Sequence, residues 1–127
     1  MWGGEPERGD FTIGFVSDMN GSYGATTYDA AVKNSLAFFA DLSVDAVFSA
    51  GDMVAGQCSS ETACNEAAMW AGFNTELYAQ LKNAGIPFLF TLQNHDAGNA
   101  WDLAAAEEFW NNPANIPQGS TLTLVDD

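Results

Sequence analysis

The sequence predicts an α/β domain with a mainly parallel sheet flanked by helices. Short apolar segments rich in β-branched and aromatic residues alternate with longer segments whose apolar residues recur at helical spacing. The connections between successive strands are long enough for crossover helices, which join parallel neighbours with a right-handed turn. A length of 127 residues corresponds to one domain, and a hydrophobic content of 47% is enough to build its core.

Three strands are predicted, over residues 11–16, 45–50 and 86–92, where β-branched and aromatic residues dominate. Each is short and mostly apolar, as is usual for strands that are buried on both faces of a parallel sheet. Leu122-Thr123-Leu124-Val125 has the same character and is a candidate for a fourth strand.

Helices are predicted between and after these strands. The first covers about 28–41, with Thr26 or Thr27 to cap its start. The second carries an apolar stripe and stops at Gly85, and a third is expected near 100–110. The aromatic residues of the second helix and the third strand are expected in the core, namely Trp70, Phe73, Phe88 and Phe90.

Seventeen acidic and three basic residues give a net charge of −14. This field repels phosphate backbones and anionic membranes, so it argues against a nucleic-acid partner. It favours cations, although solubility in a salty or extracellular setting explains the charge equally well. No apolar run approaches the roughly 20 residues that a membrane-spanning helix needs.

Cys58 and Cys64 frame a short loop whose spacing does not match a zinc ribbon. We expect a disulfide, which indicates an oxidising compartment, whereas two free thiols in a cytosolic loop are the alternative. Residues 1–10 are expected to be disordered and do not form a signal peptide. We therefore expect a periplasmic or extracellular protein whose leader was removed before this numbering begins.

Polar side chains gather where the three predicted strands end. Because the carboxyl ends of parallel strands share one edge of a sheet, we expect these side chains to form one site. Carboxylate, amide and imidazole groups are ligands for Mn, Fe, Zn or Mg, although each residue alone also suits an ordinary turn or helix cap. The candidates are Asp18, Asn20, Asp52, Asn94, His95 and Asp96.

The candidate residues lie in three blocks of sequence, Phe15-Val16-Ser17-Asp18-Met19-Asn20-Gly21, Ser49-Ala50-Gly51-Asp52-Met53 and Gln93-Asn94-His95-Asp96. These blocks resemble the first three motif blocks of the calcineurin-like metallophosphoesterases. The family pattern is Asp-x-His, then Gly-Asp-x-x, then Gly-Asn-His followed by Asp or Glu, each at the end of a strand. The resemblance covers residues 11–96 and implies that residues 11–127 form part of that family's α/β/β/α sandwich, truncated at the C-terminus.

The resemblance also implies a ligand set for two divalent ions, drawn from Mn, Fe, Zn or Mg. Asp18 would bind the first ion, with Asn20 in place of the family's histidine. Asp52 would bridge the two ions, and Asn94 would bind the second through its side-chain oxygen. The family's later histidines have no counterpart in this sequence, in which His95 is the only histidine.

The implied activity is hydrolysis of a phosphomonoester or phosphodiester by a metal-bound hydroxide. His95 would stabilise the phosphate charge or protonate the leaving group, and Asp96 would orient that imidazole. With only part of the family's ligand set, we expect weak or no activity from this chain. The alternative is a non-catalytic module of the same fold that binds divalent cations or a partner.

Overall fold

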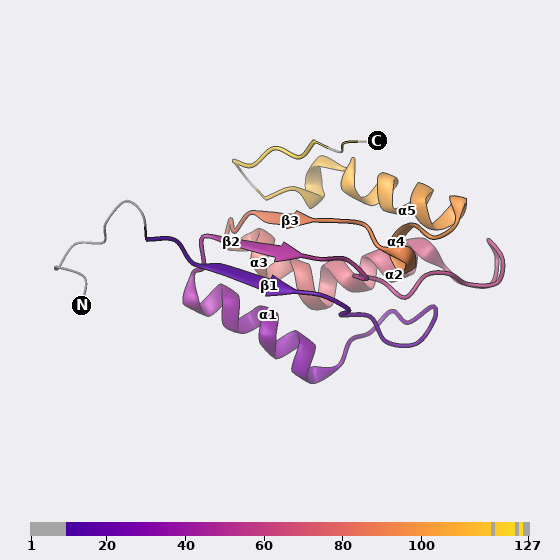
Figure 1. Cartoon of the computed structure of the whole chain (residues 1–127), viewed down its shortest axis with the longest axis horizontal. Helices are drawn as coiled ribbons and strands as arrows, with labels where there is room; N and C mark the ends of the chain where they lie inside the picture. Colours follow the sequence, from indigo (N-terminus) through magenta and orange to yellow (C-terminus); the bar gives the residue numbers. More distant parts are fainter. Residues whose placement is uncertain (1–9, 118, 124, 126–127) are drawn as a thin grey trace.

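The computed structural model describes residues 10–117, 119–123 and 125, and it confirms the α/β class (Figure 1). Strands β1 (Ile13–Val16), β2 (Ala46–Ser49) and β3 (Phe88–Phe90) pair in parallel in the order β1-β2-β3. All three predicted strands are present but shorter than expected, because pairing ends where the chain turns away at the sheet edge.

Two predictions concern segments at the chain ends. The fourth strand expected over 122–125 is wrong for its described residues 122, 123 and 125, which carry no strand, and Leu124 lies outside the described residues. Residues 1–9 of the N-terminal segment, which was expected to be disordered, also lie outside them.

The helices follow the predicted order. Helix α1 (Ala30–Leu42) starts later than expected, and its cap is Asp29, whose Oδ1 accepts from Ala31 N at 2.8 Å. The threonine cap was therefore wrong: Tyr28 N donates to Glu76 and Asp29 keeps an extended backbone, so the helix begins beyond both threonines. The other helical elements are α2 (Glu66–Phe73), the π-helical turn η1 (Asn74–Tyr78), α3 (Ala79–Asn83), α4 (Asn94–Ala97), α5 (Ala100–Trp110) and the 3-10 turn η2 (Pro113–Asn115).

The second predicted helix is thus one continuous helical stretch from α2 through η1 to α3. Gly85 follows it with φ +71°, the left-handed conformation that ends helices, which confirms the predicted stop. Among the described residues, no helix is long and apolar enough to cross a membrane.

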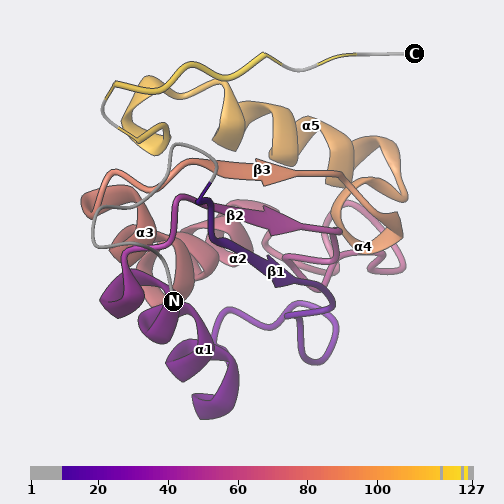
Figure 2. The ribbon, with the colours of Figure 1, turned by 60° about the vertical axis from the view of Figure 1, so that its left-hand side comes forward.

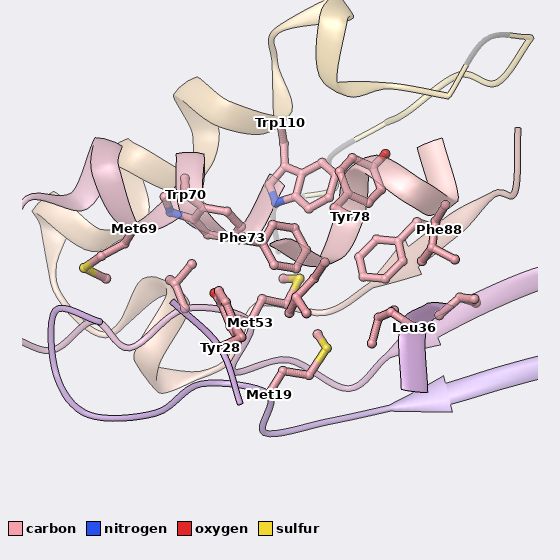
Figure 3. Packing of buried hydrophobic residues seen from close by; sticks show 14 of the residues in the cluster. Met19, Tyr28, Leu36, Met53, Met69, Trp70, Phe73, Tyr78, Phe88 and Trp110 are labelled. Atoms are coloured by element: carbon pink, nitrogen blue, oxygen red, sulfur yellow. The ribbon is translucent and has the colours of Figure 1, made fainter. Parts of the chain in front are cut away.

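One face of the sheet carries the core. Gly14, Val47 and Phe88 are aligned in register on this face, and α1 packs against it so closely that a Cβ at Gly14 would lie 2.9 Å from the Phe39 ring. Figure 3 shows the aromatic cluster between sheet and helices, where Phe88 stacks on Trp110 with ring centroids 5.9 Å apart. The core prediction is confirmed for the buried residues Trp70, Phe73 and Phe88, and Phe90 packs against them partly buried.

The opposite face of the sheet is open in the part of the chain that the structure describes. Phe15, Phe48 and Leu89 align across the three strands, and Phe15 and Leu89 are 68% and 54% exposed. The strands run side by side in both views, with α1 on one side and α5 beyond β3 (Figures 1 and 2). An all-parallel sheet usually has both faces covered, so this apolar face is an unusual feature of the described chain.

We expect this open face to bind the dye 8-anilinonaphthalene-1-sulfonate in native buffer, because contiguous exposed apolar surface is where such dyes bind. Phe15→Ser should lower the dye fluorescence by roughly half, since Phe15 is the most exposed aromatic residue of the three strands. Phe38→Ser is the control, because Phe38 is 58% exposed on α1, which covers the other face. Equal fluorescence from Phe15→Ser and the unmodified protein would contradict the assignment.

The disulfide prediction is confirmed. Cys58 and Cys64 are bonded, with Cα atoms 5.9 Å apart, in the loop that leads into α2. This loop also contacts the turn after β1, because a Cβ at Gly24 would lie 2.9 Å from Cys64 Sγ. The short covalent loop therefore fixes the segment between the second predicted block and α2.

Candidate functional site

The turns after β1 and β2 are hydrogen-bonded to each other at the carboxyl edge of the sheet. Asp18 N donates to Gly51 O at 3.1 Å, and Met19 N and Asn20 N both donate to Asp52 O, at 3.1 and 3.3 Å. Asp18 and Asp52 each adopt a left-handed backbone, with φ 51° and 54°. This conformation is uncommon outside glycine, but Asp tolerates it in turns, so both turns end their strands in the same way. The first two predicted blocks are therefore in direct contact.

The third block, which follows the third predicted strand, is a short helix. α4 begins directly after Gln93, and Asp96 Oδ2 accepts from Gln93 N at 3.1 Å, as the third residue of a capping box does. His95 N donates to Asp52 Oδ1 at 3.0 Å. The third block thus contacts the second through the Asp52 carboxylate, and all three predicted blocks meet at one edge.

Asp96 organises this edge from the interior. Its side chain is 0% exposed, and its two oxygens accept from the backbone N–H groups of Asp52, Met53 and Val54 at 2.7 to 3.1 Å, in addition to that of Gln93. Burial raises the pKa of Asp96 above its usual value, although these backbone donors act in the opposite direction. The resemblance implies that Asp96 contacts the imidazole of His95 directly. In the structure, Asp96 instead accepts hydrogen bonds from the backbone around Asp52.

The imidazole of His95 has two neighbours. Its Nδ1 lies 3.2 Å from the carbonyl oxygen of Gly56, which can only accept, so this contact requires hydrogen on Nδ1. The Nε2 atom is then the one that can accept a proton or, once protonated, donate a hydrogen bond. The ring of Tyr23 lies 5.4 Å from the imidazole, centroid to centroid, and Tyr23 is 65% exposed. Tyr23 therefore flanks His95 on the solvent side of the site.

The predicted metal ligands differ in exposure and in their present contacts. Asp52 is 9% exposed, whereas Asp18 and Asn94 are exposed. Asn20 is half-buried, and its Nδ2 donates to Val54 O at 2.9 Å, a bond that does not involve its Oδ1. Two carboxylates and two amides offer only oxygen donors, which suit hard cations such as Mg or Mn.

At this edge, no three carboxylate, imidazole or thiol groups of the described residues bring their ligand atoms within 4.8 Å of one another. The group that meets this criterion lies elsewhere, at Cys58, Cys64 and Glu66. The strand-end site thus depends on its amide oxygens, and none of the six predicted side chains takes part in the second group.

Gly56 was not among the predicted site residues, and the structure places it beside His95. Gly56 N donates to His95 O at 3.0 Å, and its own carbonyl faces the imidazole. A Cβ at this position would collide with His95 O and would lie 2.8 Å from Asp102 Oδ1. The sequence does contain a signal that this segment is buried beside the site. Met53-Val54-Ala55 is too apolar for a surface loop, and Gly51 and Gly56 flank it.

The three motif blocks are in contact at the carboxyl edge of the sheet. The first two blocks share backbone hydrogen bonds, and the third donates to Asp52. The assignment to the metallophosphoesterases stays a prediction from sequence. A scan against protein-family models and searches of curated proteins and solved structures found no match.

Proposed function

We propose that this chain carries part of the active site of a metal-dependent phosphoric-ester hydrolase of the metallophosphoesterase type. One observation supports this proposal above the others: the three predicted blocks meet at the carboxyl edge of a parallel sheet, where open α/β folds bind their ligands. The substrate class is a phosphomonoester or phosphodiester.

Asp18 and Asn20 would hold one divalent ion, Asn94 a second, and Asp52 both. The oxygen-only donor set favours Mn or Mg over Zn and Fe. Two such ions would supply Lewis-acid stabilisation of the phosphoryl oxygens and lower the pKa of water. Asp52 suits a bridging position, because Asp96 fixes its backbone and His95 N contacts only one of its two carboxylate oxygens in the described hydrogen bonds.

The remaining chemistry belongs to His95. The Gly56 carbonyl holds Nδ1–H, so Nε2 is the atom that would donate a proton to the leaving oxygen or a hydrogen bond to the phosphoryl group. Tyr23 limits the movement of the ring from the exposed side. Asp96 acts as a positioning residue through the Asp52 backbone, not through the imidazole.

The test measures Mn²⁺ binding by calorimetry together with hydrolysis of an aryl phosphate in the presence of Mn²⁺. We expect metal binding and slow turnover, with turnover lost and metal affinity lowered at least about tenfold in Asp52→Ala. Asp41→Ala is the matched control, because Asp41 is an exposed carboxylate on α1 and should leave both quantities unchanged. Equal rates for Asp52→Ala and the unmodified protein would reject the proposal.

A second candidate function is a non-catalytic module that binds divalent cations. It is favoured by the composition of the site, which combines two carboxylates and two amides with a single imidazole. The same experiment separates the two candidates: one weak site without turnover supports the module, whereas two ions with turnover support the hydrolase.

We also propose a periplasmic or extracellular location. The Cys58–Cys64 disulfide supports it, because disulfides persist in oxidising compartments. The net charge of −14 is compatible with such a setting.

A further inference from the structure

A second cluster of potential ligands lies at the start of α2, and none of the six predicted strand-end side chains belongs to it. Glu66 is the first residue of α2, and one of its carboxylate oxygens lies within 4.8 Å of the sulfur atoms of both Cys58 and Cys64. Cys58 is 6% exposed, while Cys64 and Glu66 are half-buried. Two sulfurs and one carboxylate thus converge at the edge of the core.

The carboxylates of this cluster have acceptor atoms that nothing in the described part of the chain satisfies. Both oxygens of Glu66 are buried without a hydrogen-bond partner, and so is Oδ1 of Asp102, a side chain that is 1% exposed. Asp102 uses its other oxygen to accept from Gln57 N and Asn99 N, at 3.1 and 3.2 Å. Buried acceptors without a donor destabilise the fold, so a ligand that supplies positive charge or a proton is favoured here.

The side chains of Asp102 and Glu66 face each other. Their contact raises the pKa of Glu66, after the larger effect of burial. Asp102 thus lies beside Glu66, where it can position that carboxylate as groups behind a metal ligand commonly do.

We propose that reduction of the Cys58–Cys64 disulfide opens a binding site for zinc or a metal of similar preference, with Cys58 Sγ, Cys64 Sγ and Glu66 as ligands. Asp102 serves as the positioning residue, and water takes the fourth position on the exposed side. Sulfur and carboxylate donors in this number suit Zn²⁺, which binds thiolates at about 2.3 Å and prefers a tetrahedral set. Two thiolates on one such ion lie about 3.8 Å apart, and the 5.9 Å between the two Cα atoms is compatible with that separation.

The chemistry has two balanced steps. A dithiol reductant transfers two electrons and two protons to the disulfide, yielding two cysteine thiols and the cyclic disulfide of the reductant. Metal binding then displaces one proton from each thiol to the solvent, so affinity rises with pH. The disulfide and the metal are thus alternative cross-links for the same loop.

Cobalt is a suitable probe, because tetrahedral Co²⁺–thiolate sites have intense visible bands and a thiolate-to-metal charge-transfer band that oxygen ligands lack. The protein is reduced with dithiothreitol, freed of reductant under argon, checked for two free thiols, and titrated with Co²⁺. We expect the charge-transfer band to saturate at one thiolate-bound Co²⁺ per chain, and Zn²⁺ to displace that Co²⁺. The oxidised protein should show no such band.

Variants identify the ligands. Cys58→Ser should abolish the charge-transfer intensity of a two-thiolate site, and Glu66→Gln and Asp102→Asn should each weaken Co²⁺ binding about 10- to 100-fold. Asp41→Ala should leave the charge-transfer band and its midpoint unchanged, because Asp41 is an exposed carboxylate on α1 that belongs to neither site. The band reports only thiolate-bound Co²⁺, so its absence rejects the present proposal and does not test the hydrolase site, whose metal ligands are all oxygens.

Two results would overturn the proposal. The first is a reduced protein with two free thiols that shows no charge-transfer band, and the second is a Co²⁺ affinity that Glu66→Gln leaves unchanged. Circular dichroism of the reduced protein covers the case in which reduction unfolds it: recovery of helical signal with Zn²⁺ supports the site, and no recovery rejects it.

Discussion

Asp96→Ala is expected to lower the free energy of unfolding by about 3–5 kcal/mol, measured by urea denaturation. The carboxylate of Asp96 is fully buried and accepts from four backbone N–H groups. Alanine removes every one of these acceptor interactions and leaves buried donors without partners, which is the costly case for a hydrogen bond. Such a loss would be a large share of the stability of a domain of this size.

Asp96→Asn is the closest structural comparison. The amide keeps one acceptor oxygen but turns an NH₂ group towards N–H donors, so we expect roughly half of the alanine effect. Asp41→Ala, on the exposed surface of α1, should change stability by less than about 0.5 kcal/mol. If Asp96→Ala and Asp41→Ala had equal effects, Asp96 would not be the residue that holds the second and third blocks together.

Much of the fold could be predicted because the signals are local. Helix α5 coincides with the predicted segment 100–110, and the continuous helix from α2 to α3 follows an apolar stripe at helical spacing. The stop at Gly85 needed only the preference of glycine for the left-handed backbone. The helical spacing of apolar residues and the position of a helix-ending glycine predict these elements without information about distant residues.

Features that depend on distant partners were predicted less well. The segment 122–125 has strand-forming residues, but a strand forms only where a neighbour pairs with it, and residues 122, 123 and 125 have none. α1 starts after Asp29 because Tyr28 N is engaged by Glu76, far along the chain. Neither effect is visible in a local window of sequence.

The candidate site shows the same division. The spacing of Gln93 and Asp96 is that of a capping box, so α4 could have been recognised from the sequence. The hydrogen bonds from the backbone of residues 52–54 to Asp96 join residues that are 42 to 44 positions apart in the sequence. These bonds could not have been recognised from the sequence. The sequence therefore predicted that these three blocks lie together, and only the structure distinguished the buried carboxylate of Asp96 from the exposed one of Asp18.

Gly51→Ala is expected to destabilise the protein by about 3 kcal/mol, for two separable reasons. Gly51 has φ +105°, a conformation that L side chains rarely adopt. In addition, a Cβ at this position would lie 2.7 Å from Gln93 Cβ and 3.0 Å from the backbone oxygen of Thr91. The second and third blocks approach each other here, so the added methyl group should also push Asp52 away from His95 N and weaken metal binding at the strand-end site.

Gly85→Ala isolates the first of these reasons. Gly85 also has a positive φ, +71°, but a Cβ there meets nothing within 4 Å. We expect a loss of about 1 kcal/mol from backbone strain alone, so the difference between the two variants measures the close contact between the blocks. Equal losses would mean that Gln93 and Thr91 move aside easily, and the edge would then be too adaptable to hold Asp52 in a fixed position. A larger loss at Gly51, accompanied by lower Mn²⁺ affinity in calorimetry, would tie the packing of this turn directly to the proposed ligand.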